Sequence, residues 1–370
     1  ITWDLTHQSI PAGGVDAPVG VEAADGWLIT LDEKEEATLL MVHDLSNLNS
    51  EIEVLQPEMD ENSTYTVRGD MLVMANQTVL MVVDLTNPLE VRHTMDVQSP
   101  SDVTIVSDDC FALLQDGQVT YWAFDGTENV GPTSSQGDSI ILLESSNGQI
   151  ALVFASDPDT VHLGIIDGEG LISLEVNATA DSGEDDILIA QGLNVDLENA
   201  TITDISFSGN KLAATIDVNA TSRLVLLDTL TGESQIISDH KFAAYDPHVD
   251  YGVLMFSAYT EIDPSNASSK YTDREIYIHE FSTNLTKPLT ADDLDQWAPM
   301  VLQDYYVYQQ MNSEGDISVE VQAKEPTLQP YSSNVLKFGV ILVISLAFIY
   351  IVQKQREANT SNHHGIEHVS

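Results

Sequence analysis

Thr78-Val-Leu-Met-Val-Val-Asp84-Leu-Thr-Asn-Pro88 is a short apolar run that ends in an acidic residue, a leucine and a turn. The same form recurs along the chain, with its acidic residue at Asp4, Asp44, Asp84, Asp125, Asp167, Asp228 and, as glutamate, Glu280. The early steps between these positions are 40, 40, 41 and 42 residues. A period of about forty residues with several short strands per unit is typical of β-propeller blades. The repeat therefore predicts an all-β fold built from such units.

Counting the units predicts seven blades over residues 1–323, with six or eight as open alternatives. Six blades contain the acidic positions from 44 to 280, and a seventh is built from 305–308 and 317–321. We expect residues 1–5 to supply the outer strand of that seventh blade. Pairing the two ends of the chain in one sheet would close the ring and remove an exposed sheet edge.

The recurrent acidic residues lie where an apolar strand enters a turn. An aspartate at such a position accepts hydrogen bonds from backbone N–H groups of the following turn and fixes the hairpin. We therefore interpret Asp84 and its equivalents as turn clamps within the blade scaffold, not as a ring of catalytic carboxylates.

Two polar insertions lengthen the later units. They are residues 177–186 and 263–273, and both are expected to be surface loops. Long insertions between strands cost little and often carry binding function. The sequence therefore places a partner site in these two loops.

The composition is strongly acidic, with 59 Asp and Glu against 13 Lys and Arg and a formal net charge of −46. Such a surface repels phosphates, so nucleic-acid binding is excluded as a function class. An acidic coat of this kind suits salty surroundings, where counterions screen the repulsion. The single cysteine, Cys110, cannot form a disulfide within the chain and is expected to be a buried thiol.

The C-terminal part predicts a membrane anchor. Residues 335–352 are 18 residues with one charge, Lys337, and as a helix they would span about 27 Å, close to the hydrocarbon thickness of a bilayer. Residues 324–334 contain two prolines and are interpreted as a short stalk. Residues 353–370 would then form a tail on the other side of the membrane.

Glycosylation sequons indicate the orientation, since the basic residues around the predicted helix barely decide it. Seven Asn-x-Ser/Thr sequons precede the predicted helix, at Asn62, Asn76, Asn177, Asn199, Asn219, Asn266 and Asn284. Together with the acidic coat they favour a propeller outside the cell and a cytoplasmic tail. No export leader is visible before Ile1. If the protein is exported, we expect its leader to have been removed before this numbering starts.

The last two units resemble the WD40-like repeats of TolB-type β-propellers. The resemblance rests on Tyr245-Asp-Pro-His-Val-Asp-Tyr-Gly252, on Arg274-Glu-Ile-Tyr-Ile-His-Glu280 and on Lys287-Pro-Leu-Thr290. The earlier units are looser, with Asp84-Leu-Thr-Asn-Pro88 similar to repeats of bacterial and archaeal surface propellers. The resemblance implies the architecture and leaves the activity open, because propellers support binding, scaffolding and several enzyme classes.

Motifs that carry chemistry are weak in this sequence. There is no Gly-x-Ser-x-Gly elbow and no zinc motif, so no catalytic or cofactor-binding residue is predicted. Two acidic runs carry oxygen ligands that suit Ca²⁺, although neither has the spacing of an EF-hand loop. Their members, the candidate metal ligands, are Asp292, Asp293, Asp295, Glu184, Asp185 and Asp186.

These features predict a single-pass surface protein whose propeller binds a protein or a glycan. One alternative is an enzyme, a lyase or glycoside hydrolase with paired carboxylates in the central channel. Another is an accessory subunit of a membrane complex. Charged side chains that converge in the channel would favour the enzyme, whereas small apolar residues there would argue against it.

Overall fold

The computed structural model describes residues 8–11, 18–24, 26–34, 37–46, 51–59, 63–86, 90–129, 139–146, 149–157, 160–167, 170–174, 176–180, 187–193, 200–218, 221–237, 243–259 and 273–324. Within these ranges the chain forms strands and turns and no helix, so the all-β prediction is confirmed. The chain divides into two compact units, residues 1–323 and 324–370. The second unit is described at residue 324 alone, so the predicted stalk, membrane helix and tail lie outside the described residues.

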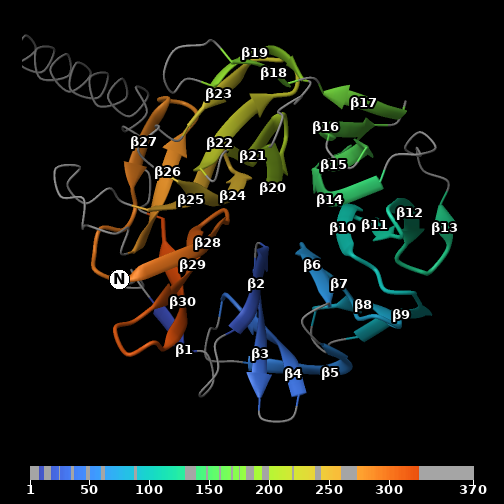
Figure 1. The fold of residues 1–370 in the computed structure, drawn as a ribbon. Coiled ribbons are helices and arrows are strands. Elements are labelled where there is room, and N and C mark those ends of the chain that lie inside the picture. Colours follow the sequence, from blue (N-terminus) through green and yellow to red (C-terminus); the bar gives the residue numbers. More distant parts are fainter. Residues whose placement is uncertain are drawn as a thin grey trace, which may run out of the picture. The chain divides into compact units, whose positions relative to one another are not determined.

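Six antiparallel sheets in the described part of the chain each take four strands in chain order (Figure 1). The first three comprise β2 (Pro18–Ala24), β3 (Trp27–Lys34), β4 (Ala37–Asp44) and β5 (Glu51–Met59); β6 (Thr64–Arg68), β7 (Met71–Ala75), β8 (Val79–Asp84) and β9 (Glu90–Asp96); and β10 (Asp102–Ser107), β11 (Cys110–Gln115), β12 (Gln118–Ala123) and β13 (Glu128–Asn129). The next three comprise β14 (Ser139–Ser146), β15 (Gln149–Asp157), β16 (Thr160–Asp167) and β17 (Gly170–Leu174); β20 (Ala200–Ser208), β21 (Lys211–Val218), β22 (Thr221–Asp228) and β23 (Ser234–Ile236); and β24 (Ala244–Asp250), β25 (Val253–Tyr259), β26 (Arg274–Glu280) and β27 (Leu285–Pro288).

A seventh four-stranded sheet joins the two ends of the first unit. Its members are β28 (Asp295–Val301), β29 (Tyr305–Met311), β30 (Ile317–Ala323) and β1 (Gln8–Pro11). The prediction that an N-terminal strand completes the last sheet is confirmed, but the strand consists of other residues than those predicted. Gln8 to Pro11 pair with Val321 to Ser318, whereas the predicted 1–5 lie outside the described residues. An outer strand buries little, as the fully exposed β27 shows, so it carries no apolar run by which to locate it.

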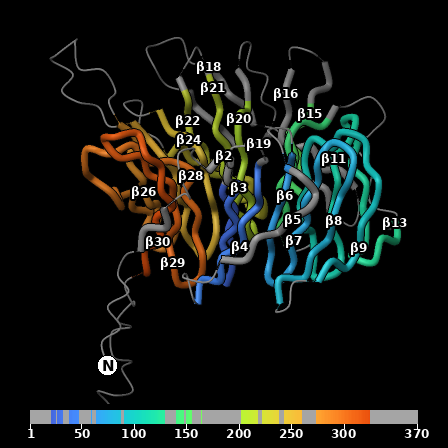
Figure 2. The backbone as a smooth tube through the Cα atoms, turned by 90° about the horizontal axis from the view of Figure 1, so that it is seen from below, coloured from blue at the N-terminus to red at the C-terminus, as the bar shows by residue number. Residues whose placement is uncertain are grey.

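The sheets follow one another around a ring through their first strands. β2, β6, β10, β14, β20, β24 and β28 each contact the next, and β28 contacts β2. Figure 1 shows these strands on the inside, with β9 and β13 at the rim, and Figure 2 shows the same sheets from the side. Seven apolar clusters of described residues each lie between two consecutive sheets, and the cluster with Leu28 and Met300 lies between the last sheet and the first.

The repeated apolar run is the third strand of its sheet. β8 illustrates why the run is continuous: Met81 and Val83 pack toward the first sheet, whereas Leu80 and Val82 pack toward the third. Because neighbouring sheets cover both faces of the strand, alternation between apolar and polar residues disappears. β4, β12, β16, β22 and β26 are the equivalent third strands, and their ends coincide with the periodic acidic positions or lie two residues before them.

The turn-clamp interpretation is confirmed for the four aspartates whose side chains are described, Asp44, Asp84, Asp125 and Asp228. Asp84 Oδ1 accepts hydrogen bonds from Thr86 N at 3.0 Å and Thr86 Oγ1 at 2.6 Å. Asp44 and Asp125 accept the backbone N–H two residues ahead, at 2.8 and 2.9 Å. Asp228 accepts from both Leu230 N and Thr231 N. Each aspartate therefore holds the turn between the third and fourth strands.

Replacing Asp228 with alanine is expected to lower the free energy of unfolding by about 1–2 kcal/mol, because two backbone N–H groups and Lys211 lose their acceptor. Burial opposes ionisation of Asp228, but bonds led by the one from Lys211 hold its pKa at about 2. A carboxyl with a depressed pKa stabilises the fold above its unfolded pKa and loses this effect as the pH falls through the folded one. Chemical denaturation should therefore show the Asp228→Ala deficit near neutral pH and a smaller deficit toward about pH 2. Equal stability of the two proteins near neutral pH would contradict the clamp.

Candidate functional site

A large cavity in the described part of the chain is the central channel. It has a volume of about 770 Å³ and is lined by residues of all seven first strands. The sequence had placed the partner site in the insertions instead. Residues 177–180 of the first insertion are not a loop, because β18 (Val176–Ala180) pairs with β19 (Ile187–Leu193) in an additional hairpin. Residues 181–186 and 260–272 lie outside the described residues.

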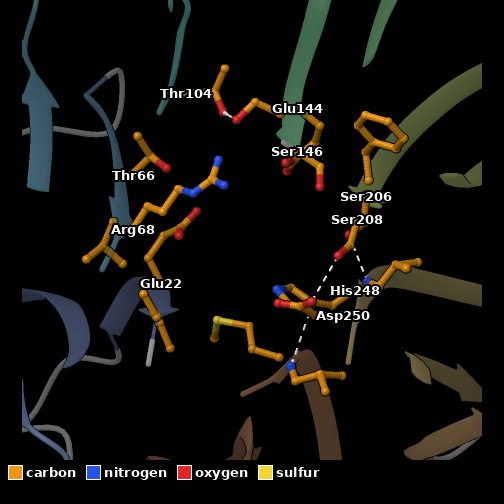
Figure 3. Close-up of a pocket in the computed structure, with 18 of the residues that line it drawn as sticks. Glu22, Thr66, Arg68, Thr104, Glu144, Ser146, Ser206, Ser208, His248 and Asp250 are labelled. Atoms are coloured by element: carbon orange, nitrogen blue, oxygen red, sulfur yellow. Dashed lines mark hydrogen bonds between the residues drawn. The ribbon is translucent and has the colours of Figure 1, made fainter. Parts of the chain in front are cut away.

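The pairing register of the first strands places the residues that line the channel at a few distinct heights along it, which we call levels. In six sheets, the third residue pair from the hairpin between the first and second strands places one first-strand residue at the same height. Met300 of β28 occupies the same position when the Leu302–Tyr305 pair, joined by a hydrogen bond from Leu302 N to Tyr305 O, is counted as the first. We call these seven residues the channel ring: Glu22, Thr66, Thr104, Glu144, Ser206, His248 and Met300. Figure 3 shows Glu22, Glu144 and His248 approaching the channel from different blades, with Arg68 on the side of Glu22.

Two further levels flank the channel ring. On the side where the first strands begin, Asp102 and Asp204 occupy the fifth residue pair, and Asp246 lies in the bulge of β24. On the hairpin side, Arg68, Ser146, Ser208 and Asp250 form the last pair of their strands. The channel is therefore polar along its length, not lined by small apolar residues.

The lining is dominated by acidic side chains. Seven carboxylates, those of Glu22, Asp102, Asp108, Glu144, Asp204, Asp246 and Asp250, line the channel together with Arg68. One nitrogen of the Arg68 guanidinium donates to the carbonyl oxygens of Ile105 and Val106, at 3.1 and 3.2 Å. Among the described residues, no Lys or Arg forms an ion pair with Glu22, Asp102, Glu144 or Asp204. We call these four residues the inner carboxylates.

The environment of the inner carboxylates favours their protonated forms. Burial, followed by the charge of Asp102, raises the pKa of Glu22 to about 8. Burial raises the pKa of Asp102 to about 6, against the hydrogen bonds it accepts from Leu143 N and Val103 N at 3.0 and 2.8 Å. Burial, followed by the charge of Asp246, raises the pKa of Asp204 to about 7. Burial, followed by the charge of Glu22, raises the pKa of Glu144 well above its usual value.

Several polar groups of the lining also tie neighbouring blades together. Asp102 Oδ2 accepts the backbone N–H of Leu143 in the next first strand. The hydroxyl of Ser206 accepts a hydrogen bond from the backbone N–H of Val249, at 2.9 Å. His248 Nδ1 accepts one from the backbone N–H of Val301, at 3.2 Å. Because its Nδ1 acts as an acceptor, the His248 ring is neutral while this bond is made. The channel is thus held rigid by the side chains that make it polar.

Of the predicted metal ligands, Asp292 and Asp295 are engaged elsewhere, Asp293 is exposed, and the other three are not described. Asp295 pairs with Arg274 through two bonds of 3.0 and 3.1 Å, and Asp292 Oδ1 accepts from Leu294 N and Gln296 Nε2. No group of three or more His, Cys, Asp or Glu in the described residues is placed to hold a metal ion. Glu184, Asp185 and Asp186 lie outside the described residues.

Two of the predicted glycosylation acceptors have described side chains. Asn76 Oδ1 accepts Thr78 N and Val79 N, at 2.9 and 2.8 Å, in the turn before β8. Asn284 is exposed, with a φ of 54°, in the turn before β27. The side chains of the remaining five, Asn62, Asn177, Asn199, Asn219 and Asn266, are not described.

The inner carboxylates are absent from the sequence predictions, although a signal for two of them exists. Asp102-Val-Thr-Ile, Asp204-Ile-Ser-Phe and Asp246-Pro-His-Val share an aspartate, then a polar residue two positions on, then an apolar one. All three begin the channel-lining part of a first strand. Glu22 and Glu144 fall outside this pattern, and only the register brings them to the same level.

No protein-family model matches the sequence, and no curated protein matches it either. Solved structures do match the fold. The β-propeller domain of the Trilobed protease from Pyrococcus furiosus is 11% identical over 85% of this chain and 98% of its own, with a TM-score of 0.56. An oligogalacturonate lyase from Vibrio parahaemolyticus is 10% identical over 87% and 98% of the two chains, with a TM-score of 0.53. The WD40 domain of Toxoplasma gondii coronin is 12% identical over 88% and 86%, with a TM-score of 0.53.

These likenesses show the fold and nothing finer. The chain has a β-propeller fold, as its resemblance to WD40-like and TolB-type repeats predicted. Propellers of peptidases, of a lyase and of WD40 proteins all share it. Because one fold supports several activities, the function has to be argued from the channel.

Proposed function

We propose that the chain is a seven-bladed β-propeller that acts as a binding module and takes a positively charged segment of a partner protein into its central channel. The observation that carries this proposal is the channel lining, in which seven carboxylates face one arginine. A narrow, low-dielectric cleft of one sign focuses its field and concentrates ligands of the opposite charge. Lysine or arginine side chains supply that charge.

The dimensions of the channel support a segment rather than a folded partner. A cavity of about 770 Å³ falls within the range that encloses a small ligand or a few side chains. The hydroxyls of Thr66 and Ser208, which also line the channel, offer groups that can bind backbone amides. Anionic ligands such as uronate chains are disfavoured by the same charge. WD40 propellers commonly bind proteins, and the fold is compatible with this role.

Glu22 and Glu144 provide the test. Fluorescence anisotropy with a labelled, capped peptide of alternating lysine and glycine should show binding to the full chain in detergent that weakens as salt is added. The double variant Glu22→Gln, Glu144→Gln should bind about tenfold or more weakly, since about 1.4 kcal/mol of lost attraction is a factor of ten. The matched control Glu233→Gln, Glu314→Gln removes the same charge from exposed sites and should bind like the wild type. Equal loss in both variants, or equal binding of a glutamate–glycine peptide, would refute the channel as the site.

We further propose that residues 335–352 anchor the propeller at a cell membrane, with residues 1–323 outside and 353–370 inside. The support is the length and apolarity of this segment and the seven sequons that precede it. Among the described residues, no helix is long and apolar enough to cross a membrane. Protease protection on intact cells tests the orientation: a propeller digested only after lysis would contradict it.

A glycoside hydrolase is the second candidate, because the channel holds carboxyls with separated pKa values. Glu22, whose pKa is raised to about 8, can donate a proton near neutral pH. Asp102, whose pKa is raised to about 6, is ionised at that pH and can act as a base. Release of reducing ends from neutral oligosaccharides, lost in Glu22→Gln, would support this function. The absence of release from a broad panel would leave binding as the better account.

A further inference from the structure

The inner carboxylates meet in one cavity although they come from four blades. Glu22 of β2 and Glu144 of β14 lie in the channel ring, while Asp102 of β10 and Asp204 of β20 lie at the neighbouring level. The blade-to-blade bond from Leu143 N to Asp102 fixes the β10 and β14 strands relative to each other. Since these strands belong to a closed ring of packed sheets, the carboxylates cannot move apart to relieve their repulsion.

The remaining charged groups do not neutralise the inner carboxylates. The titratable groups that face the channel from the seven first strands and their hairpins are Glu22, Tyr65, Arg68, Asp102, Asp108, Glu144, Asp204, Asp246, His248, Asp250 and Tyr251. Arg68 is the one fixed cation among them, and its guanidinium donates to backbone carbonyl oxygens of β10. His248 is neutral while it accepts Val301 N. Protons are therefore the cations that can neutralise the inner carboxylates when no ligand is bound.

We propose that the channel is a proton-linked gate: in the empty channel the inner carboxylates hold protons, and an entering ammonium or guanidinium group displaces them to the solvent. This inference rests on the proposed binding of a cationic segment. The exchange is balanced, since each proton leaves a carboxyl oxygen for water or buffer while the incoming cation takes its place beside the carboxylate. The partner is accordingly bound when the pH rises and released when it falls.

The pH window of the gate follows from the inner carboxylates. The pKa values of Asp102, Asp204 and Glu22, at about 6, about 7 and about 8, give the interval in which these three carboxyls of the empty channel lose their protons. A carboxyl whose pKa is raised in the folded state stabilises the fold below its unfolded pKa, and this contribution is lost as the pH rises through the folded pKa. The empty protein should therefore become less stable between about pH 5 and pH 8, and a bound cation should reverse this loss.

The first measurement needs no ligand. Thermal unfolding of the full chain in detergent, recorded between about pH 5 and pH 8, should show a falling midpoint for the wild type. The double variant Glu22→Gln, Glu144→Gln, which mimics the protonated pair, should show a clearly smaller fall. The exposed control Glu233→Gln, Glu314→Gln should follow the wild type. Identical pH dependence in all three proteins would contradict the proposal that the inner carboxylates hold protons in the empty channel.

The second measurement is calorimetric titration with the lysine–glycine peptide in two buffers of different ionisation enthalpy. The affinity should rise up to about tenfold per pH unit for each proton released, and the heat should depend on the buffer. The double variant should lose most of both effects, whereas the exposed control should keep them. Binding that is independent of pH and buffer would overturn the gate and leave the proposed function standing. No binding at any pH would overturn the proposed function and the gate with it.

Discussion

Replacing Phe111 with alanine is expected to lower the free energy of unfolding by about 3–5 kcal/mol. Phe111 lies on β11, is fully buried, and packs with Val73 and Val103 between the second and third sheets. Its ring stacks on Phe124 with a centroid distance of 6.2 Å and an interplanar angle of 12°. The truncation removes both the buried apolar area and the aromatic contact, and the rigid sheets on either side cannot close the cavity.

Chemical denaturation of Phe111→Ala measures this loss of stability. Two further variants serve as comparisons. Phe111→Leu keeps most of the volume and should lose clearly less stability. Leu230→Ala truncates a side chain that is 83% exposed and should change the free energy of unfolding by less than about 0.5 kcal/mol. If Phe111→Ala were as mild as Leu230→Ala, the packed interface between these two sheets would be wrong.

Replacing Arg274 with methionine is expected to lower the free energy of unfolding by about 2 kcal/mol. Arg274 of β26 donates two bonds to Asp295 of β28, so the pair joins the sixth and seventh sheets. Its guanidinium also lies 5.1 Å from the centre of the Trp297 ring, close enough for a cation–π interaction. Removing one member of a fully buried pair costs about 3–5 kcal/mol, and the partial exposure of this pair reduces that figure.

A double-mutant cycle separates the pair from general packing effects. Arg274→Met, Asp295→Asn and the double variant should give a coupling energy of about 1 kcal/mol or more in chemical denaturation. Arg274→Lys keeps the charge but not the two-bonded geometry, and should recover part of the loss. A coupling energy near zero would show that the pair does not hold these two sheets together.

The architecture was predictable because the third strand of each blade is buried on both faces. This burial produces the apolar run around Val82, and the turn that follows needs an acceptor such as Asp84, so run and acid recur together. The outer strands lack such a signal. For this reason the closing strand was predicted at 1–5, whereas the structure places it at Gln8–Pro11.

The channel was not predictable in the same way. Glu22 and Glu144 have no motif in common, and only the pairing of Glu22 with Ile29 and of Glu144 with Ala151 puts them at one level. Single acidic residues are also inconspicuous in a chain with 59 of them. Converging charged side chains are the feature expected of the enzyme alternative, and the structure brings such side chains together in the channel.

The most direct measurement is a crystal structure of the full chain with the lysine–glycine peptide, grown near pH 8, where Asp102 and Asp204 are expected to have lost their protons. The account predicts difference density for the peptide inside the channel, with an ammonium group within hydrogen-bonding distance of Glu22 or Glu144. A peptide bound on the outer rim of the blades, with the channel free of it, would contradict the account.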